Sequence, residues 1–369
     1  MNVNFSSTIE QWYSLHRREL PWRQTRDPYR IWVSEIILQQ TRVVQGMEYY
    51  HRFIARFPDV RSLAEAEEDE VLRLWQGLGY YSRARNMHKA ARQVMELGGC
   101  FPDTFEGVRR LAGIGDYTAA AIMSFAYEQP YAVLDGNVFR VLSRVLGIDT
   151  PIDSTGGKKM FAALAQEMMD TRQPSLYNQA IMDFGALQCT PKGYDCPSCP
   201  LMGQCVACAE NRVGELPVKS HKTAIRQRHL IYIYTHEAAS DSPCLLLHRR
   251  GKDDIWEGLY ELPLIELPAT EPDTLPRAPW LEAMMQDGAR LECRAQGVRH
   301  QLTHQLLLAD CYELTVTFPL SEWLSSHPDL VQDLQFQSVP LSALDRYGMP
   351  RLVLQLLAKC GISGKNLEI

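Results

Sequence analysis

Hydrophobic residues recur every three or four positions along about the first 208 residues, which is the spacing of amphipathic helices. This pattern predicts helices at residues 33–41, 71–75 and 82–97, separated by turn-forming Gly, Pro and Asp residues. Long runs of alternating apolar and polar residues do not occur in this part of the sequence. We therefore predict an all-α domain over residues 1–209.

The pattern changes after a polar segment at residues 210–227, which contains Gly and Pro and shows no clear period. Apolar runs typical of strands follow at residues 229–235, 242–248, 306–308 and 312–318. Helical spacing appears at residues 280–285 and 351–359. This mixture predicts a linker at residues 210–227 and an α+β domain over residues 228–369.

The chain has 369 residues, enough for two domains, and a formal net charge of −6. This balance argues against a generally basic nucleic-acid coat protein but leaves a local basic surface open. The first 220 residues hold 24 Lys and Arg against 25 Asp and Glu, so most of the acidic excess lies in the second domain. No secretory signal and no apolar run of about 18 residues is found, so we expect a cytoplasmic protein without a membrane span.

Four of the ten cysteines, Cys189, Cys196, Cys199 and Cys205, fall within 17 residues. In a cytoplasmic chain, clustered cysteines are more typical of a metal site than of disulfides. Prolines in the same stretch indicate a tight loop rather than a core helix. Four thiolates can hold either zinc or an iron–sulfur cluster, and the ligand type alone leaves both open. A fifth cysteine, Cys208, exceeds the four that such a site needs.

A Gly-x-Gly turn at Gly113 and Gly115 separates two short helical segments within residues 104–125. Glycine permits tight backbone geometry, and the N–H groups that begin the second helix, near Thr118, can then point at a phosphate. The arrangement is similar to the helix-hairpin-helix, which grips DNA phosphates without reading the base sequence. Because Gly-x-Gly turns between helices are common, the turn alone does not establish DNA binding.

Two carboxylates have surroundings that suit catalysis. Glu35 is a lone carboxylate in an apolar helical run, where burial would raise its pKa and let it donate a proton near neutrality. Asp135 lies at a predicted helix start, where an aspartate often serves as the N-cap. In glycoside hydrolysis one carboxyl group protonates the leaving group and a second stabilises the positive charge on the sugar. The alternatives are an exposed helix glutamate and a purely structural N-cap.

Residues 32–41, residues 134–138 and the cysteine spacing together resemble the endonuclease III and MutY family of DNA glycosylases. The resemblance implies an all-α helix-hairpin-helix domain with a [4Fe–4S] cluster on the four cysteines and no catalytic metal. It further implies removal of adenine paired with 8-oxoguanine or guanine in double-stranded DNA, with Glu35 protonating the adenine and Asp135 stabilising the sugar cation. Tyr117 stands where bifunctional relatives carry the lysine that forms a Schiff base, which implies a monofunctional enzyme.

The same resemblance assigns further residues to the bound DNA. The residues expected around the flipped adenine and the gap that it leaves are Trp22, Arg23, Leu38, Gln39, Gln40, Asn137 and Asp183. Tyr80 would insert beside the damaged guanine, and Arg83 or Arg85 would meet a phosphate. The alternative for this segment is a core tyrosine pair with solvated arginines.

The second domain is similar to the Nudix-like domain with which MutY proteins recognise 8-oxoguanine. Thr303 and His304, preceded by Leu302, stand where the recognition loop of the family usually reads Phe-Ser-His. A hydrolytic Nudix domain needs a dense cluster of glutamates, whereas the glutamates at positions 257, 261 and 266 are spaced differently. We therefore expect this domain to bind a base rather than to hydrolyse nucleotides.

The sequence thus predicts a bacterial, monomeric base excision repair enzyme with an all-α domain followed by an α+β Nudix-like domain. Three alternatives stay open. They are an endonuclease III-like glycosylase and lyase acting on oxidised pyrimidines, a DNA-damage sensor that catalyses nothing, and an active Nudix hydrolase fused to a helical DNA-binding module.

Overall fold

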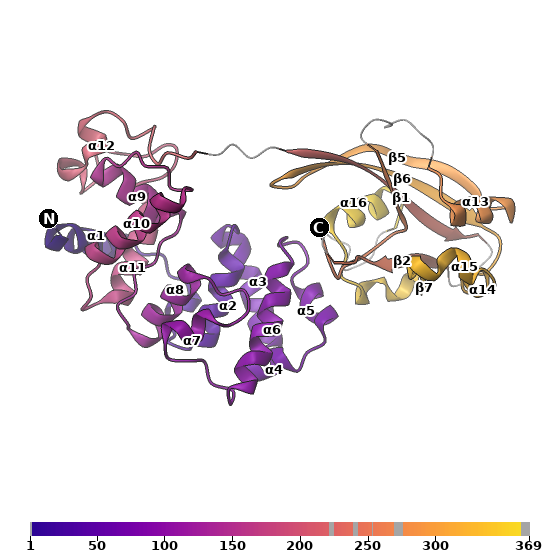
Figure 1. The fold of residues 1–369 in the computed structure, drawn as a ribbon, viewed down its shortest axis with the longest axis horizontal. Coiled ribbons are helices and arrows are strands. Elements are labelled where there is room, and N and C mark those ends of the chain that lie inside the picture. Colours follow the sequence, from indigo (N-terminus) through magenta and orange to yellow (C-terminus); the bar gives the residue numbers. More distant parts are fainter. Residues whose placement is uncertain (1, 221–224, 239–242, 253, 269–275, 363–369) are drawn as a thin grey trace. The chain divides into compact units, whose positions relative to one another are not determined.

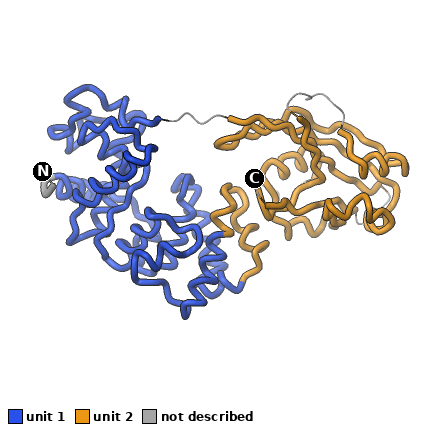
Figure 2. Tube along the Cα trace, in the orientation of Figure 1, with its two compact units in different colours: residues 1–65, 86–222 blue, residues 66–85, 223–369 orange. Residues whose placement is uncertain are grey.

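The computed structural model describes residues 2–220, 225–238, 243–252, 254–268 and 276–362 (Figure 1). The chain forms two compact units (Figure 2). The first unit contains residues 1–65 and 86–222, and the second contains residues 66–85 and 223–369. Residues 66–85 therefore group with the C-terminal part of the chain, although they lie within the predicted helical domain.

The first unit is built from helices. Its elements are α1 (Asn2–His16), η1 (Pro21–Arg23), α2 (Pro28–Leu38), α3 (Val43–Arg56), α4 (Val60–Ala64), α6 (Ser82–Glu96, whose first residues belong to the second unit), α7 (Phe105–Arg109), α8 (Asp116–Tyr127), α9 (Gly136–Leu146), α10 (Thr155–Met168), α11 (Pro174–Asp183), the π-helical turn η2 (Phe184–Gln188), η3 (Met202–Gln204) and α12 (Val206–Ala209). Residues 2–220 contain no strand, which confirms the predicted helical character. Across the described part of the chain, no helix has the length and apolar character needed to span a bilayer.

Helices α2 and α8 form the centre of the first unit and pack against each other. Both are buried around most of their circumference, as expected for helices whose residues are apolar on nearly every face. Asp27 caps α2 by accepting a hydrogen bond from the Tyr29 N–H. The predicted helix at residues 33–41 ends at Leu38, because Gln39 is not helical and Gln40 adopts a left-handed φ of 57°.

The second unit is an α+β structure with two sheets. Its strands are β1 (Arg226–Glu237), β2 (Cys244–Arg249), β3 (Tyr260–Glu261), β4 (Leu264–Leu267), β5 (Arg290–Gln301), β6 (Gln305–Val316) and β7 (Gln337–Pro340). They form a sheet of order β4-β1-β6-β5 and a second of order β3-β2-β7. The pair β1 and β6 is parallel, and the other pairs are antiparallel. Its helices are α5 (Glu68–Leu74), α13 (Pro279–Gln286), α14 (Leu320–Ser326), α15 (Pro328–Val331), η4 (Gln332–Leu334), η5 (Leu341–Arg346) and α16 (Arg351–Lys359).

Two sequence-based predictions for this unit are wrong in detail. The apolar runs at residues 306–308 and 312–318 belong to one strand, β6, rather than to two. Strand β5 was not predicted, because it is an edge strand whose mostly polar and exposed residues carry no buried alternation. Residue 242, the first of the predicted strand at 242–248, lies outside the described residues, and β2 begins at Cys244.

Candidate active site

A cavity of about 750 Å³ opens in the first unit beside α2, α8 and the start of α9. This volume lies within the range of sites that hold a small molecule or a single base. Most of the predicted base-pocket and catalytic residues line this cavity: Trp22, Arg23, Glu35, Leu38, Gln39, Gln40, Gly115, Tyr117, Thr118, Asp135 and Asn137. Residues that are spread over more than 100 positions of the sequence therefore line one cavity in the folded protein.

Glu35 lies on α2 with only 7% of its surface exposed. Tyr117, from the first turn of α8, donates a hydrogen bond of 2.7 Å to Glu35 Oε2. The pKa of Glu35 is raised to about 7, mainly by burial and also by nearby Asp135, while the Tyr117 hydrogen bond and Arg23 act in the opposite direction. A carboxyl group with this pKa can donate a proton at neutral pH.

Asp135 is the N-cap of α9 and also lines the cavity. Its Oδ1 accepts hydrogen bonds from the backbone N–H groups of Asn137 (2.9 Å) and Val138 (2.8 Å), and its Oδ2 accepts one from Asn137 Nδ2 (2.7 Å). Burial raises the pKa of Asp135, while these donors and Arg140 lower it by favouring the carboxylate. Asp135 therefore caps α9 and lines the cavity at the same time.

Asp183 stands behind the cavity wall rather than in it. Its side chain is fully buried at the end of α11, where both carboxylate oxygens accept hydrogen bonds from Arg23 (2.7 and 2.8 Å). Arg18 forms a second ion pair with the same carboxylate. Asp183 therefore orients two arginines that line the cavity. Arg18 was missed by the sequence analysis, in which nothing distinguishes it from the neighbouring Arg17.

The two glycines of the predicted hairpin differ in their surroundings. Gly113 has a φ of 72°, and a Cβ there would lie 2.6 Å from Asn86 Cβ. Gly115 is extended, forms the N-cap of α8, and has open space where a Cβ would be. Only Gly113 is thus required by the fold, while Gly115 leaves the backbone at the helix start open to a ligand. The Thr118 side chain lies in the cavity, 3.4 Å from Gln39 Nε2.

This difference predicts contrasting effects of the same substitution. Gly113→Ala should destabilise the protein by about 1–3 kcal/mol, because alanine is strained at positive φ and contacts Asn86 too closely. Gly115→Ala, the matched control, should leave the unfolding midpoint nearly unchanged but weaken binding of a DNA duplex. Thermal melts and a fluorescence-anisotropy titration measure both effects, and equal melting temperatures would contradict the assignment of Gly113.

The four predicted ligand cysteines line one small pocket of the first unit, together with Cys208. Arg144, a buried residue of α9, donates a hydrogen bond of 3.3 Å to Cys189 Sγ and so places positive charge beside these thiols. Within the described residues, no three His, Cys, Asp or Glu side chains meet around a position that could hold a single metal ion. The four cysteines therefore lie together in one pocket, with the buried Arg144 beside Cys189.

A second cavity, of about 470 Å³, lies in the second unit. The predicted recognition residues Tyr80, Thr303 and His304 line it, and the Tyr80 hydroxyl forms a hydrogen bond with Thr303 Oγ1. Trp256 and His300 also line it, with their ring centres 5.9 Å apart. The sequence analysis assigned neither residue to a site, although both lie in the stretches 255–263 and 299–304 that are similar to landmarks of the Nudix-like domain.

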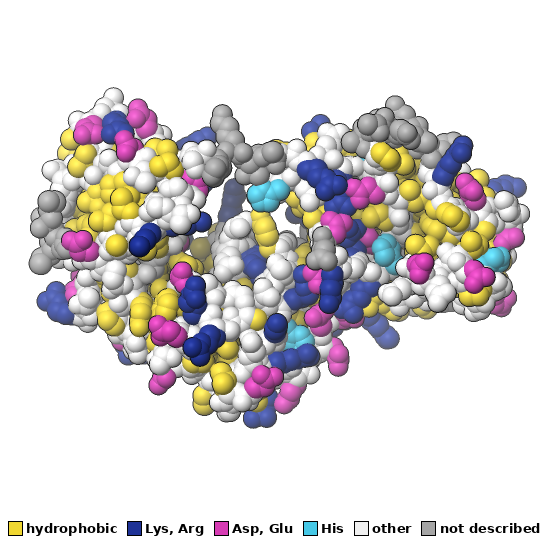
Figure 3. Space-filling view, viewed as in Figure 1, with side chains coloured by type: hydrophobic (Ala, Val, Ile, Leu, Met, Phe, Trp, Pro, Cys, Tyr) yellow, Lys and Arg dark blue, Asp and Glu magenta, His cyan; other side chains and the backbone are white. Residues whose placement is uncertain are grey.

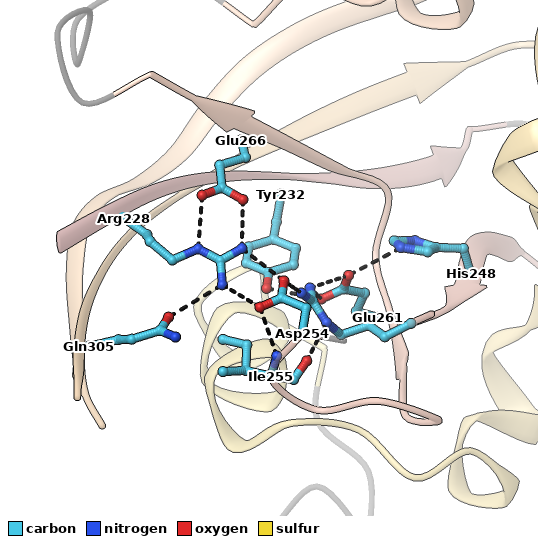
Figure 4. A network of polar contacts seen from close by, with 9 residues as sticks. Arg228, Tyr232, His248, Asp254, Ile255, Glu261, Glu266 and Gln305 are labelled. Atoms are coloured by element: carbon cyan, nitrogen blue, oxygen red, sulfur yellow. Dashed lines mark hydrogen bonds and ion pairs between the residues drawn. The ribbon is translucent and has the colours of Figure 1, made fainter. Parts of the chain in front are cut away.

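A polar network holds the loop beside this cavity (Figure 4). Arg228 makes paired hydrogen bonds with Asp254 (2.6 and 2.8 Å) and with Glu266 (2.8 and 2.6 Å). Arg250 binds both oxygens of the fully buried Glu261. Glu257 in turn pairs with Arg85 at 2.8 Å. The three glutamates at positions 257, 261 and 266 each have an arginine partner, which leaves them poorly suited to gather divalent metal ions.

Charged side chains are mixed rather than separated on the visible face of the molecule (Figure 3). Lys and Arg lie among Asp and Glu over each unit, without one continuous basic surface on that face. This agrees with the net charge of −6, and indicates that any phosphate contact depends on local groups.

Residues 33–166 match the family model described as "HhH-GPD superfamily base excision DNA repair protein", and residues 238–359 match a NUDIX domain. The chain is 42% identical over 222 residues to the adenine DNA glycosylase of Mus musculus. This alignment covers 58% of this chain but only 43% of the mouse protein. The chain is 34% identical over 261 residues to the adenine DNA glycosylase of Buchnera aphidicola subsp. Schizaphis graminum, which covers 70% of this chain and 74% of that protein.

Among solved structures, a thermostable thymine-DNA glycosylase matches with a TM-score of 0.53 and 28% identity, over 57% of this chain and 97% of that chain. The predicted combination of a helix-hairpin-helix glycosylase domain with a Nudix-like domain is confirmed. The extent of the match to the Buchnera protein, added to the two domain matches, shows that the chain belongs to the adenine DNA glycosylase family of base excision repair.

Proposed function

We propose that this protein removes adenine paired with 8-oxoguanine in double-stranded DNA by hydrolysing the N-glycosidic bond. The observation that carries the proposal is the buried Glu35, whose pKa is raised to about 7, in the same cavity as Asp135 and Tyr117. A proton donor beside a second carboxylate is the arrangement that N-glycosidic cleavage needs. Similarity to adenine DNA glycosylases supports adenine as the base removed.

The reaction begins when the adenine leaves the base stack and enters the cavity, at a cost that is smaller for a mispaired base. Glu35 then transfers its proton to the adenine ring, and the electron pair of the bond between the sugar and the base leaves with the adenine. The sugar becomes a cation, which the Asp135 carboxylate stabilises. Water adds to the sugar and passes a proton to the Glu35 carboxylate, which restores the acid and leaves an abasic site and free adenine.

This mechanism predicts a single-turnover rate that depends on the protonation of Glu35. The rate should be highest below pH 7 and fall as the pH rises above it, because Glu35 with a pKa of about 7 then loses the proton it must donate. Tyr117→Phe removes a hydrogen bond that favours the charged carboxylate, so the pKa of Glu35 should rise and the midpoint should move to higher pH. A pH–rate profile measures the shift.

The matched control is Tyr29→Phe, another tyrosine hydroxyl, which is bonded to the Phe57 carbonyl at 2.8 Å and does not line the cavity. It should leave the midpoint of the profile in place. A midpoint that moves to lower pH in Tyr117→Phe would mean that the tyrosine does not act on Glu35 in the way proposed.

We further propose that Cys189, Cys196, Cys199 and Cys205 hold one [4Fe–4S] cluster. Their spacing resembles that of the iron–sulfur loop of the endonuclease III and MutY family, and all four line one pocket of the first unit, which supports the cluster. Bound there, it would anchor the loop of residues 189–205. Iron, sulfide and zinc analysis of the purified protein tests this, and stoichiometric zinc without iron would contradict it.

The 8-oxoguanine would lie at the cavity of the second unit. This base differs from guanine in an added carbonyl oxygen and in an N–H group where guanine has an acceptor, so a hydroxyl that both donates and accepts can distinguish them. Thr303, bonded to Tyr80, supplies such a hydroxyl, and His304 lines the same cavity. We infer that the protein acts on the duplex as a monomer, without a catalytic metal.

A panel of duplexes tests the substrate assignment. We expect faster adenine release from 8-oxoguanine·adenine than from guanine·adenine, and no covalent adduct after borohydride treatment, since Tyr117 cannot form a Schiff base. An adduct, or release of an oxidised pyrimidine instead of adenine, would favour the endonuclease III-like alternative.

A further inference from the structure

The segment that carries Tyr80 has an unusual backbone. Between α5 and α6, Gly77 (φ 97°), Gly79 (φ 72°) and Tyr80 (φ 48°) all adopt left-handed conformations. Glycine does so easily, but a bulky residue does so only where its surroundings impose it. The Tyr80 side chain is 44% exposed, so burial of its ring in a core does not account for this backbone.

Two side chains hold the segment from the inside. Trp75, which is fully buried, donates a hydrogen bond from Nε1 to the Gly79 carbonyl at 3.1 Å. Arg83 donates from Nη2 to the carbonyls of Gly79 (3.2 Å) and Leu78 (3.4 Å). Both groups bind the peptide immediately before Tyr80, so together they fix the direction in which Tyr80 leaves the backbone.

The guanidinium of Arg83 also lies close to two aromatic rings. It is 5.2 Å from the centre of the Trp75 ring and 5.7 Å from the centre of the Tyr80 ring, within the range of a cation–π contact. Burial lowers the pKa of Arg83 to about 10, which still leaves it charged at neutral pH. The side chain is thus directed to the loop and its rings, whereas the sequence analysis predicted a phosphate contact for it.

We propose that Arg83 is a positioning residue that holds Tyr80 in its left-handed conformation beside the recognition cavity. The inference rests on the proposed insertion of Tyr80 beside the damaged guanine, and it replaces a phosphate contact with a role exerted through Tyr80. The guanidinium performs two tasks, since it binds the two carbonyls before Tyr80 and packs against its ring. Recognition of 8-oxoguanine then depends on a residue that does not touch the base.

A double-mutant cycle tests the proposal. Arg83→Met should weaken binding to an 8-oxoguanine·adenine duplex, relative to guanine·adenine, by about tenfold, the size expected for a lost cation–π contact and a lost hydrogen bond. The single-turnover rate at saturating enzyme should change little. In a Tyr80→Ala background, Arg83→Met should have no further effect, because its target is already absent. If Arg83→Met does not fold, Arg83→Lys, which loses the planar guanidinium, carries the same cycle.

The salt dependence of binding separates this role from a phosphate contact. Loss of a phosphate contact lowers the slope of log affinity against log salt by about 1, whereas loss of a positioning residue leaves the slope unchanged. Lys89→Met, which removes an exposed charge from the same helix, is the control for charge loss and should leave the preference for 8-oxoguanine intact. A reduced slope with Arg83→Met, or an equal loss in the Tyr80→Ala background, would overturn the proposal. If the wild-type protein binds the damaged duplex selectively but releases no adenine, the proposed activity fails while this test of Arg83 still applies.

Discussion

Replacing Glu35 with glutamine should lower the rate of adenine release at pH 7 by roughly 100-fold to 10,000-fold, the contribution typical of a general acid. Glutamine has nearly the same shape as glutamate, and its carbonyl oxygen can still accept the hydrogen bond from Tyr117. What it loses is the proton that the raised pKa of Glu35 makes available near pH 7. Single-turnover release of adenine from an 8-oxoguanine·adenine duplex measures the effect.

Two controls test whether the loss of rate is specific to the Glu35 proton. Glu48→Gln, which makes the same chemical change at an exposed position on α3, should leave the rate unchanged. Glu35→Gln itself should bind the duplex about as well as the wild-type protein, because the cavity keeps its shape. An unchanged rate in Glu35→Gln would remove Glu35 as the acid and leave the buried carboxyl group without a function.

Asp135→Asn should produce the second large effect, a fall in the rate of roughly 100-fold to 1,000-fold, as expected when a group that stabilises transition-state charge is neutralised. Asparagine is as good an N-cap as aspartate, so its side-chain oxygen can still accept hydrogen bonds from the Asn137 and Val138 N–H groups, and only the bond from Asn137 Nδ2 is lost. The melting temperature should therefore fall only slightly, whereas the rate falls strongly. Rate and melting temperature are measured on the same preparation.

The comparison with another N-cap separates catalysis from capping. Ser154 caps α10 by accepting a hydrogen bond from the Gly157 N–H at 3.0 Å, and it does not line the cavity. Ser154→Ala should cost about 1 kcal/mol of stability and leave the rate intact. If Asp135→Asn instead behaves like Ser154→Ala, losing stability but not rate, Asp135 is only a helix cap.

Much of the active site could be predicted because its candidate catalytic residues lie in short local sequence patterns. Glu35 is a charged residue inside an apolar helical run, and such a residue either is exposed to solvent or, if buried, is a candidate functional residue. Asp135 precedes a helix, and the glycines at 113 and 115 lie between two helices, so local rules place all of them. Their meeting in one cavity is a consequence of folding that the sequence alone implies only through family resemblance.

The features that escaped prediction depend on contacts between distant parts of the chain. Nothing near Arg83 reveals that its guanidinium lies close to the rings of Trp75 and Tyr80. Residues 66–85 group with the C-terminal part, to which they are joined by contacts such as the ion pair of Arg249 with Asp69, 180 positions apart. Edge strand β5 is polar along most of its length, so hydrophobic periodicity cannot detect it.

The central claim, that this chain hydrolyses the bond between adenine and its sugar opposite 8-oxoguanine, has one direct test. The wild-type protein, in excess over an 8-oxoguanine·adenine duplex, is incubated at pH 7 and the released bases are identified by chromatography and mass spectrometry. We predict free adenine in an amount that approaches one per duplex, with the DNA strand intact until the abasic site is cleaved by alkali. No released base, a base other than adenine, or strand cleavage without alkali would contradict the claim.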